Sequence, residues 1–128
     1  MIDFSKNPIF KLAKTDIGNS LGAMEFQRGL VLAGEEILNI YSGGRDCVIF
    51  TNKRVVAINV QGLTGSKKDF TSIPYSKIQA FSVETAGAFD RDAEMELCIS
   101  GLGKIKFEFS KGTDVAEISR ILAYYTIK

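Results

Sequence analysis

The chain has 128 residues, of which 45 % are hydrophobic and 24 % charged, with a formal net charge of +1 and no histidine. These values describe one ordinary globular domain, and the near-neutral charge argues against a general nucleic-acid binder. The lack of histidine excludes histidine-dependent nucleophilic catalysis, the usual zinc sites and histidine-based pH switching. No apolar run approaches the ~20 residues that cross a membrane, and residues 1–8 lack the apolar core of a signal peptide, so a cytoplasmic location is expected.

The N-terminal part of the chain, residues 1–34, is expected to form an arm and a helix attached to one structural domain of residues 35–128. Residues 1–17 have irregularly spaced apolar side chains. Pro8 would interrupt a helix running through it, although it fits the first turn of a short helix over 8–14. We expect the arm to pack on its own domain or on a neighbouring one; an amphipathic membrane anchor is the alternative.

A helix is predicted for residues 19–33, with Asn19 or Ser20 as the N-cap and with Gly22 and Gly29 weakening it. After this helix the apolar residues alternate with period two, which is typical of strands. Short connections, mostly rich in glycine, join about seven expected strands into antiparallel hairpins. These strands are expected at 36–42, 46–51, 54–61, 67–73, 77–85, 92–100 and 104–110.

The segment 47–60 differs from the other predicted strands because both of its faces are apolar. One face carries Ile49, Val56 and Ile58, and the other carries Val48, Phe50, Val55 and Ala57. Neither face should therefore contact bulk water. One face is expected to line the core, and the other needs a cover, which is the 19–33 helix, the N-terminal arm or a second protein chain.

The last predicted hairpin alternates regularly between apolar and polar residues. Leu97 and Phe107 fall on the core face, whereas Cys98 falls on the polar face. A loop of residues 101–103 would set Cys98 opposite Lys106. A slip by one residue would bury charges, so we expect the pairing to be well specified.

A C-terminal helix is predicted after Gly112, where the apolar spacing changes to 3.6 residues. Thr113 or Asp114 can cap it. Its apolar stripe consists of Val115, Ile118, Leu122 and Tyr125. A single amphipathic helix after a run of antiparallel strands is typical of a lid on a sandwich or an open barrel.

Several short words of this sequence occur, in order, in one protein family: Phe-Thr-Asn-Lys-Arg (50–54), Gln-Gly-Leu-Thr-Gly (61–65), Ile-Pro-Tyr-Ser (73–76), Val-Glu-Thr-Ala-Gly (83–87) and Phe-Ser-Lys-Gly (109–112). Over roughly residues 35–124 the chain resembles the bacterial pleckstrin-homology-like domains. The resemblance implies a mainly β fold with α: a pleckstrin-homology-like barrel of about seven antiparallel strands, capped by a C-terminal helix, with an N-terminal helical extension. It also implies a binding or assembly module, because the family has no established enzymatic activity and its members tend to form cyclic homo-oligomers.

Two groups of charged residues are candidate surfaces. The acidic group contains Glu84, Asp90 and Asp92, and we favour a charged sheet face over a calcium site because the carboxylates that follow alternate along a strand. On a near-neutral protein, separate acidic and basic edges suit head-to-tail pairing of identical subunits, to which the apolar Ile49, Val56 and Ile58 would contribute. The basic group is interpreted either as a patch for an acidic peptide or protein, or as solvated hairpin ends; its members are Arg45, Lys53, Arg54, Lys67 and Lys68.

The preferred hypothesis is a non-enzymatic binding and assembly module that forms a cyclic homo-oligomer. The alternative is a peripheral membrane module that binds anionic lipid headgroups through Arg45, Lys53, Arg54 and Lys67, with help from the N-terminal arm. Phosphoinositide-binding relatives carry several basic residues in their first two strands, whereas residues 36–51 offer only Arg45. No cofactor or metal is expected, and Cys47 and Cys98 are interpreted as small strand residues rather than nucleophiles.

Overall fold

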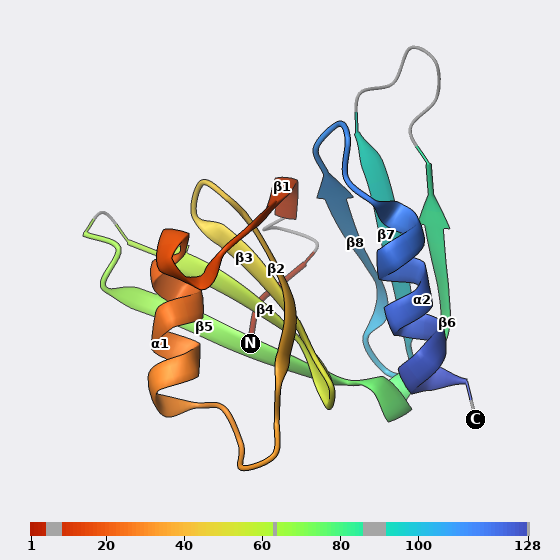
Figure 1. Cartoon of the computed structure of the whole chain (residues 1–128), viewed down its shortest axis with the longest axis horizontal. Helices are drawn as coiled ribbons and strands as arrows, with labels where there is room; N and C mark the ends of the chain where they lie inside the picture. The colour runs from red at the N-terminus through yellow and green to blue at the C-terminus, as the bar shows by residue number, and fades with distance from the viewer. Residues whose placement is uncertain (5–8, 63, 86–91, 128) are drawn as a thin grey trace.

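The computed structural model describes residues 1–4, 9–62, 64–85 and 92–127. These residues form an eight-stranded sheet with two helices packed on it (Figure 1). The strands are β1 (Ile9–Thr15), β2 (Ile37–Gly43), β3 (Asp46–Thr51), β4 (Arg54–Gln61), β5 (Lys67–Pro74), β6 (Ile78–Glu84), β7 (Ala93–Ile99) and β8 (Gly103–Phe109). The helices are α1 (Leu21–Gly29) and α2 (Val115–Thr126), and short 3-10 turns, η1 (Ile17–Asn19) and η2 (Tyr75–Lys77), precede α1 and β6.

The sheet is long and open at both ends. Its strand order is β5-β4-β3-β2-β1-β8-β7-β6, so β5 and β6 are the two edge strands. Neighbours pair antiparallel except β1 and β8, which are parallel. The two halves of the sheet meet in the main core, where Val48 and Phe50 of one half join Leu97 and Phe107 of the other. The mainly β fold with a C-terminal helix is therefore confirmed, but the barrel does not close.

The N-terminal arm forms a strand that the sequence pattern did not reveal. β1 pairs with β2 on one side and with β8 on the other, and its Leu12 is fully buried. The expectation of irregular structure, or of a short helix over 8–14, is wrong for the described part of that range. The slot between β2 and β8 supplies hydrogen-bond partners to both edges of β1, and this tertiary pairing outweighs a weak local pattern.

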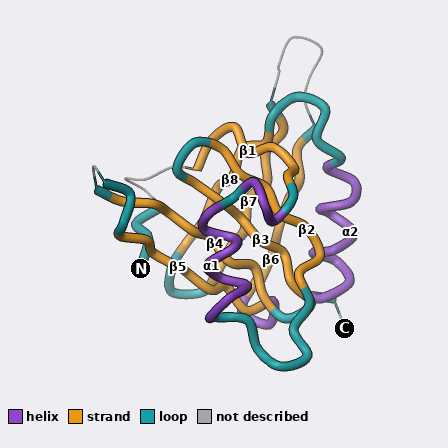
Figure 2. The backbone as a smooth tube through the Cα atoms, turned by 60° about the vertical axis from the view of Figure 1, so that its left-hand side comes forward, coloured by secondary structure: helices purple, strands orange, loops and turns teal. Residues whose placement is uncertain are grey.

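Helix α1 covers the second apolar face of β3 and β4. In Figure 2 it lies across β4 and β5, on the opposite side of the molecule from α2. Below it, Ala23 and Phe26 of the helix enclose a second core. Three side chains that were candidates for a subunit interface, Ile49, Val56 and Ile58, lie in this core and are 0 % exposed.

The interface role expected for those three side chains therefore needs correction, because the chain's own helix is their cover. The helix approaches the sheet closely at Gly22, where an added Cβ would stand 3.0 Å from the Ile58 Cγ2 atom. Ser20 caps the helix as predicted, accepting a hydrogen bond from the Ala23 backbone N–H at 3.2 Å. α1 ends at Gly29, earlier than expected.

The last hairpin has the predicted faces with a different pairing. Ile99 lies opposite Gly103, so Cys98 faces Lys104 instead of Lys106. The turn starts one residue earlier than expected because Gly101 and Gly103 both adopt positive φ, which tightens the turn there. Since the pairing moves by an even number of residues, every side chain stays on its predicted face.

Helix α2 closes the main core. Asp114 caps it by accepting a hydrogen bond from the Glu117 N–H at 3.1 Å, and Ile118 and Leu122 are fully buried, as their spacing predicted. Tyr125 stacks on Tyr75 of η2 with ring centroids 5.0 Å apart. Neither described helix has the length and apolar character needed to cross a bilayer.

Candidate interaction surface

Arg54 of the basic group is committed to an internal network. Its Nε lies 2.9 Å from Oε2 of Glu35, whose side chain is fully buried, and its Nη1 donates to Ser72 Oγ at 2.9 Å. The guanidinium also lies 5.0 Å from the centre of the Phe26 ring of α1. Hydrogen bonding from Arg54 is the largest influence on Glu35 and lowers its pKa to about 2. Arg54 therefore holds the fold together and is not free to bind an anion.

The other basic residues do not form one patch either. Arg45 donates to the Gly62 carbonyl, and Lys68 lies 3.1 Å from Glu25 of α1. Lys53 belongs to the β3–β4 turn, whereas Lys67 begins β5 at the far end of β4, where it pairs with Gln61. The five predicted residues are thus split between two ends of the sheet. A multiply charged headgroup could not be contacted by all of them at once.

The acidic residues lie in the half of the sheet that β6, β7 and β8 form. Glu84 faces Glu94 across β6 and β7, and Glu94 in turn faces Glu108 on β8. Lys106 relieves part of this charge, with its Nζ 3.6 Å from Glu94. Asp92 is half-buried just before β7, and Asp90 lies outside the described residues. The predicted acidic edge is therefore present at the ends of β6 and β7 through Glu84 and its neighbours.

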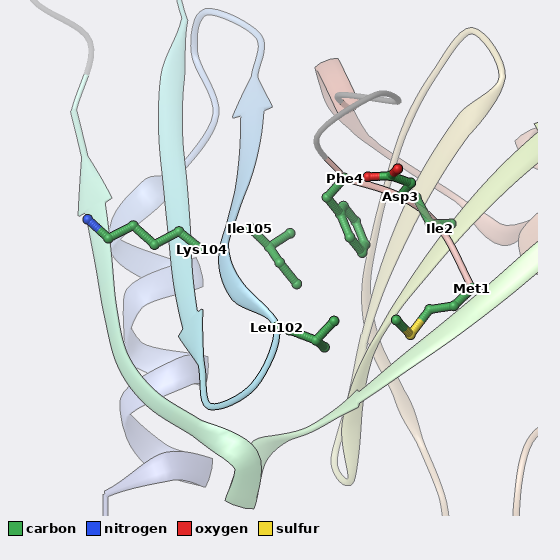
Figure 3. Close-up of a pocket in the computed structure, with 7 residues that line it drawn as sticks. All are labelled: Met1, Ile2, Asp3, Phe4, Leu102, Lys104 and Ile105. Carbon is green, nitrogen blue, oxygen red and sulfur yellow. The ribbon is translucent and has the colours of Figure 1, made fainter.

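A small pocket lies between the N-terminal residues and the tip of the β7–β8 hairpin (Figure 3). Its volume is about 350 Å³, and Ile105 and Leu102 face the first residues of the chain across it. Phe4 packs edge-on to Phe107 at 5.9 Å, and the Ile2 N–H donates to Thr71 Oγ1 at 3.0 Å. The described part of the arm thus packs on its own domain. Apolar side chains line the pocket together with the charged Asp3 and Lys104.

The two cysteines occupy different environments. Cys47 is buried, accepts a hydrogen bond from Ser20 Oγ at 3.4 Å, and burial raises the pKa of its thiol. Cys98 is half-buried on the outer face of β7. Within the described ranges, no three His, Cys, Asp or Glu side chains gather as metal ligands do.

The feature that sequence reasoning missed is the pair of free sheet edges. Among the residues that the structure describes, β5 pairs with β4 alone and β6 with β7 alone. A hollow of about 410 Å³ runs along Lys68–Ser72 of β5, where Met1 also borders it. Another of about 240 Å³ lies on the face of the sheet, where Ala80 and Ser82 of β6 neighbour Glu96, Cys98 and Lys104. No local pattern shows which strands become edges, because strand order depends on long-range pairing.

Comparison with known proteins agrees with this architecture. The family model described as "Bacterial PH domain" matches residues 4–126. A protein of the DUF1696 family with a pleckstrin-homology domain, from Shewanella loihica PV-4, superimposes with a TM-score of 0.77 at 38 % identity, covering 91 % of this chain and 98 % of that one. A pleckstrin homology domain from Shewanella amazonensis SB2B gives a TM-score of 0.66 at 41 % identity, covering 89 % and 90 %.

Among curated proteins, the "Uncharacterized protein YjqA" of Bacillus subtilis (strain 168) is 42 % identical over 96 residues, which are 73 % of this chain and 77 % of that protein. The resemblance predicted from the short sequence words is therefore confirmed, together with the pleckstrin-homology-like fold. The chain belongs to the bacterial PH domain family.

Proposed function

We propose that this bacterial PH domain is a non-enzymatic binding and assembly module that forms a cyclic homo-oligomer. Identical subunits join head to tail, with the basic end of one sheet edge against the acidic end of the other. Such a contact uses two different surfaces of each subunit, so it repeats around a ring until the ring closes.

The observation that carries this proposal is the charge at the ends of the two edge strands. Lys67 at the start of β5 and Glu84 at the end of β6 are both exposed, and neither forms an ion pair with another described residue. The other cations of the predicted group are used differently, since Arg54 and Lys68 have carboxylate partners within the subunit. Complementary charges without an ion-pair partner among the described residues are suited to steering and aligning a neighbour.

Binding of anionic lipid has less support. The basic residues expected to contact a headgroup lie at two ends of the sheet, and Arg54 already balances the charge of the buried Glu35. One or two separated cations attract an anionic surface weakly, and physiological salt screens that attraction.

Light scattering coupled to size exclusion tests the assembly. At micromolar concentration the native mass should be several times the 14.0 kDa of one chain. Lys67→Glu should raise the protein concentration at which half of the oligomer dissociates by about threefold to tenfold. The reason is that an attractive charge pair between subunits becomes a repulsive one. Combining Lys67→Glu with Glu84→Lys should restore it.

Lys111→Glu is the charge-matched control, since Lys111 is exposed in the turn before α2 and belongs to neither edge strand. It should leave the mass unchanged. A clean monomer for the wild-type chain would refute the proposal. So would a charge-swapped variant that stays as weak as Lys67→Glu alone.

A further inference from the structure

The pocket between the N-terminal residues and the β7–β8 hairpin has the size of a small-molecule site. Its volume of about 350 Å³ lies within the range of roughly 300–1,000 Å³ that ligand pockets occupy. Ile2 and Phe4 form one wall, and Leu102 and Ile105 form the other (Figure 3). Ile2 and Ile105 are buried, whereas Leu102 is 47 % exposed. The pocket therefore suits a ligand with an apolar body that enters from solvent.

The charged groups around the pocket give it a negative character. The carboxylate of Asp3 borders it. Both ammonium groups of the lining residues have partners, since the Met1 ammonium lies 3.0 Å from Asp69 Oδ2 and Lys104 Nζ lies 3.6 Å from Glu96 Oε1. Figure 3 shows the Lys104 side chain pointing away from the other residues of the pocket. An anionic ligand would thus meet a carboxylate, while both nearby cations are already paired.

The Phe4 ring is a second group that attracts a cation. It points into the space between Ile105 and Ile2 (Figure 3), and its contact with Phe107 is edge-type, with ring centroids 5.9 Å apart. The faces of an aromatic ring carry partial negative charge, so they attract an ammonium group that lies within about 6 Å of the ring centre. Aromatic rings are used in this way to recognise quaternary ammonium groups.

We propose that this pocket binds a small organic cation, a quaternary ammonium group that carries an apolar substituent. The substituent packs between Leu102 and Ile105, and the ammonium lies near the Phe4 ring and the Asp3 carboxylate. Asp3 takes part in other interactions, but a carboxylate has about four acceptor positions and can hold a further cation. The binding does not depend on the proposed assembly, because every residue that lines the pocket belongs to one chain.

The ligand is a free solute rather than a lipid headgroup. In a choline lipid the phosphate follows the ammonium closely, and binding would bring that phosphate against the carboxylate of Asp3. Like charges at this distance repel, so the same ammonium chemistry on a vesicle surface should not hold the chain.

Titration of the full chain followed by nuclear magnetic resonance tests the site. The cationic probe is benzyltrimethylammonium chloride, and the neutral probe is benzyl alcohol, which carries the same phenyl ring. Both should shift the backbone amide signals of Leu102 and Ile105. The cation should bind about threefold to tenfold more tightly, because it adds one contact with an aromatic ring and one exposed charge pair. Sodium chloride at the same concentration corrects for the effect of salt.

The variant Asp3→Asn separates charge from shape. It should lower the affinity for benzyltrimethylammonium by about twofold to threefold and leave the affinity for benzyl alcohol unchanged. Asp16→Asn is the matched control, since Asp16 is exposed before η1 and its side chain does not cap that turn. It should change neither affinity. An Asp3→Asn variant that binds both probes equally less well would show that Asp3 only shapes the pocket, and the cation site would fail.

Three further results would overturn the inference, and none of them bears on the assembly. The first is equal affinity of the wild-type chain for the two probes, which would leave an apolar hollow without selectivity for a cation. The second is a set of shifted signals that excludes Leu102 and Ile105, because the cation would then bind elsewhere. The third is co-sedimentation of the chain with phosphatidylcholine vesicles that benzyltrimethylammonium reverses, which would assign the pocket to a lipid headgroup.

Discussion

The two halves of the sheet treat their outer faces in opposite ways. Under α1, the outer face of β3 and β4 is apolar and fully buried, with Ile49 and Val56 at 0 % exposure. Over the outer face of β7 and β8 the described residues place no helix, and this face carries ion pairs, with Lys104 3.6 Å from Glu96. Where the chain supplies a cover the face is apolar, and where it does not the face is charged. The apolar sheet face is therefore no evidence of an oligomer, and the search for an interface moves to the sheet edges.

The largest effect should come from the core-facing side of the β7–β8 hairpin. Phe107 is 0 % exposed in the main core, and Phe107→Ala should lower the free energy of unfolding by about 3–5 kcal/mol, because it removes a large side chain and leaves a cavity. Cys98→Ser is the control on the outer face of the same hairpin, where a half-buried polar atom keeps access to water. Its cost should stay below about 1 kcal/mol.

Chemical denaturation followed by intrinsic fluorescence or circular dichroism measures both variants. Similar large losses for the two would mean that the outer face of β7 is covered in solution. The contrast between the two sheet faces would then be wrong for this hairpin.

The next effect concerns Glu35, which joins the loop after α1 to the turn between β3 and β4. Glu35 follows α1 and accepts hydrogen bonds from Arg54, from Thr51 Oγ1 at 2.7 Å and from the Leu32 N–H at 3.0 Å. Glu35→Gln should cost about 3 kcal/mol near neutral pH, because the largely buried Arg54 loses its counter-charge. Thermal or urea unfolding at neutral pH measures this loss.

The same carboxylate predicts an acid dependence. Its pKa is 4.5 in ordinary surroundings and about 2 in the folded chain, so folding favours the ionised form. Its contribution is complete above about pH 4.5 and disappears as the pH falls towards 2, at most about 3 kcal/mol in total. Urea unfolding between pH 6 and 2.5 should therefore show the wild type converging on Glu35→Gln. Parallel curves would show that Glu35 is not the group responsible.

Local patterns were sufficient for the elements whose faces are regular. The hairpin β7–β8 and the helix α2 follow from alternation and spacing, because their residues contact the core and the solvent side in turn. β3 and β4 were predicted from their apolar runs between turns, although both of their faces are buried. β1 could not be predicted, since its partners β2 and β8 come much later in the chain and no alternation marks it. The same limit applies to strand order, and so to the free edges of β5 and β6.

The charged candidates show a second limit. Arg54 and Lys67 look alike in sequence, yet one has a buried carboxylate partner and the other has none among the described residues. That difference depends on Glu35, which is nineteen positions away from Arg54 and is brought near by the loop after α1. Composition predicts that charges exist, while packing decides which of them remain available.

The smallest expected effect concerns how closely α1 packs against β4. Gly22 faces Ile58, and an added Cβ would meet it at 3.0 Å, whereas nothing lies within 4 Å of a Cβ at Gly29 of the same helix. Gly22→Val should destabilise the fold by about 1–3 kcal/mol through overpacking. Gly29→Ala should stabilise it by up to about 1 kcal/mol, because alanine lowers the entropy cost of the helix without a new contact. Thermal unfolding of the pair separates packing from helix propensity, since propensity alone favours both valine and alanine over glycine in a helix. If Gly22→Val is tolerated as well as Gly29→Ala, α1 stands further from β4 in solution, and the outer face of β3 and β4 would again be open to a partner.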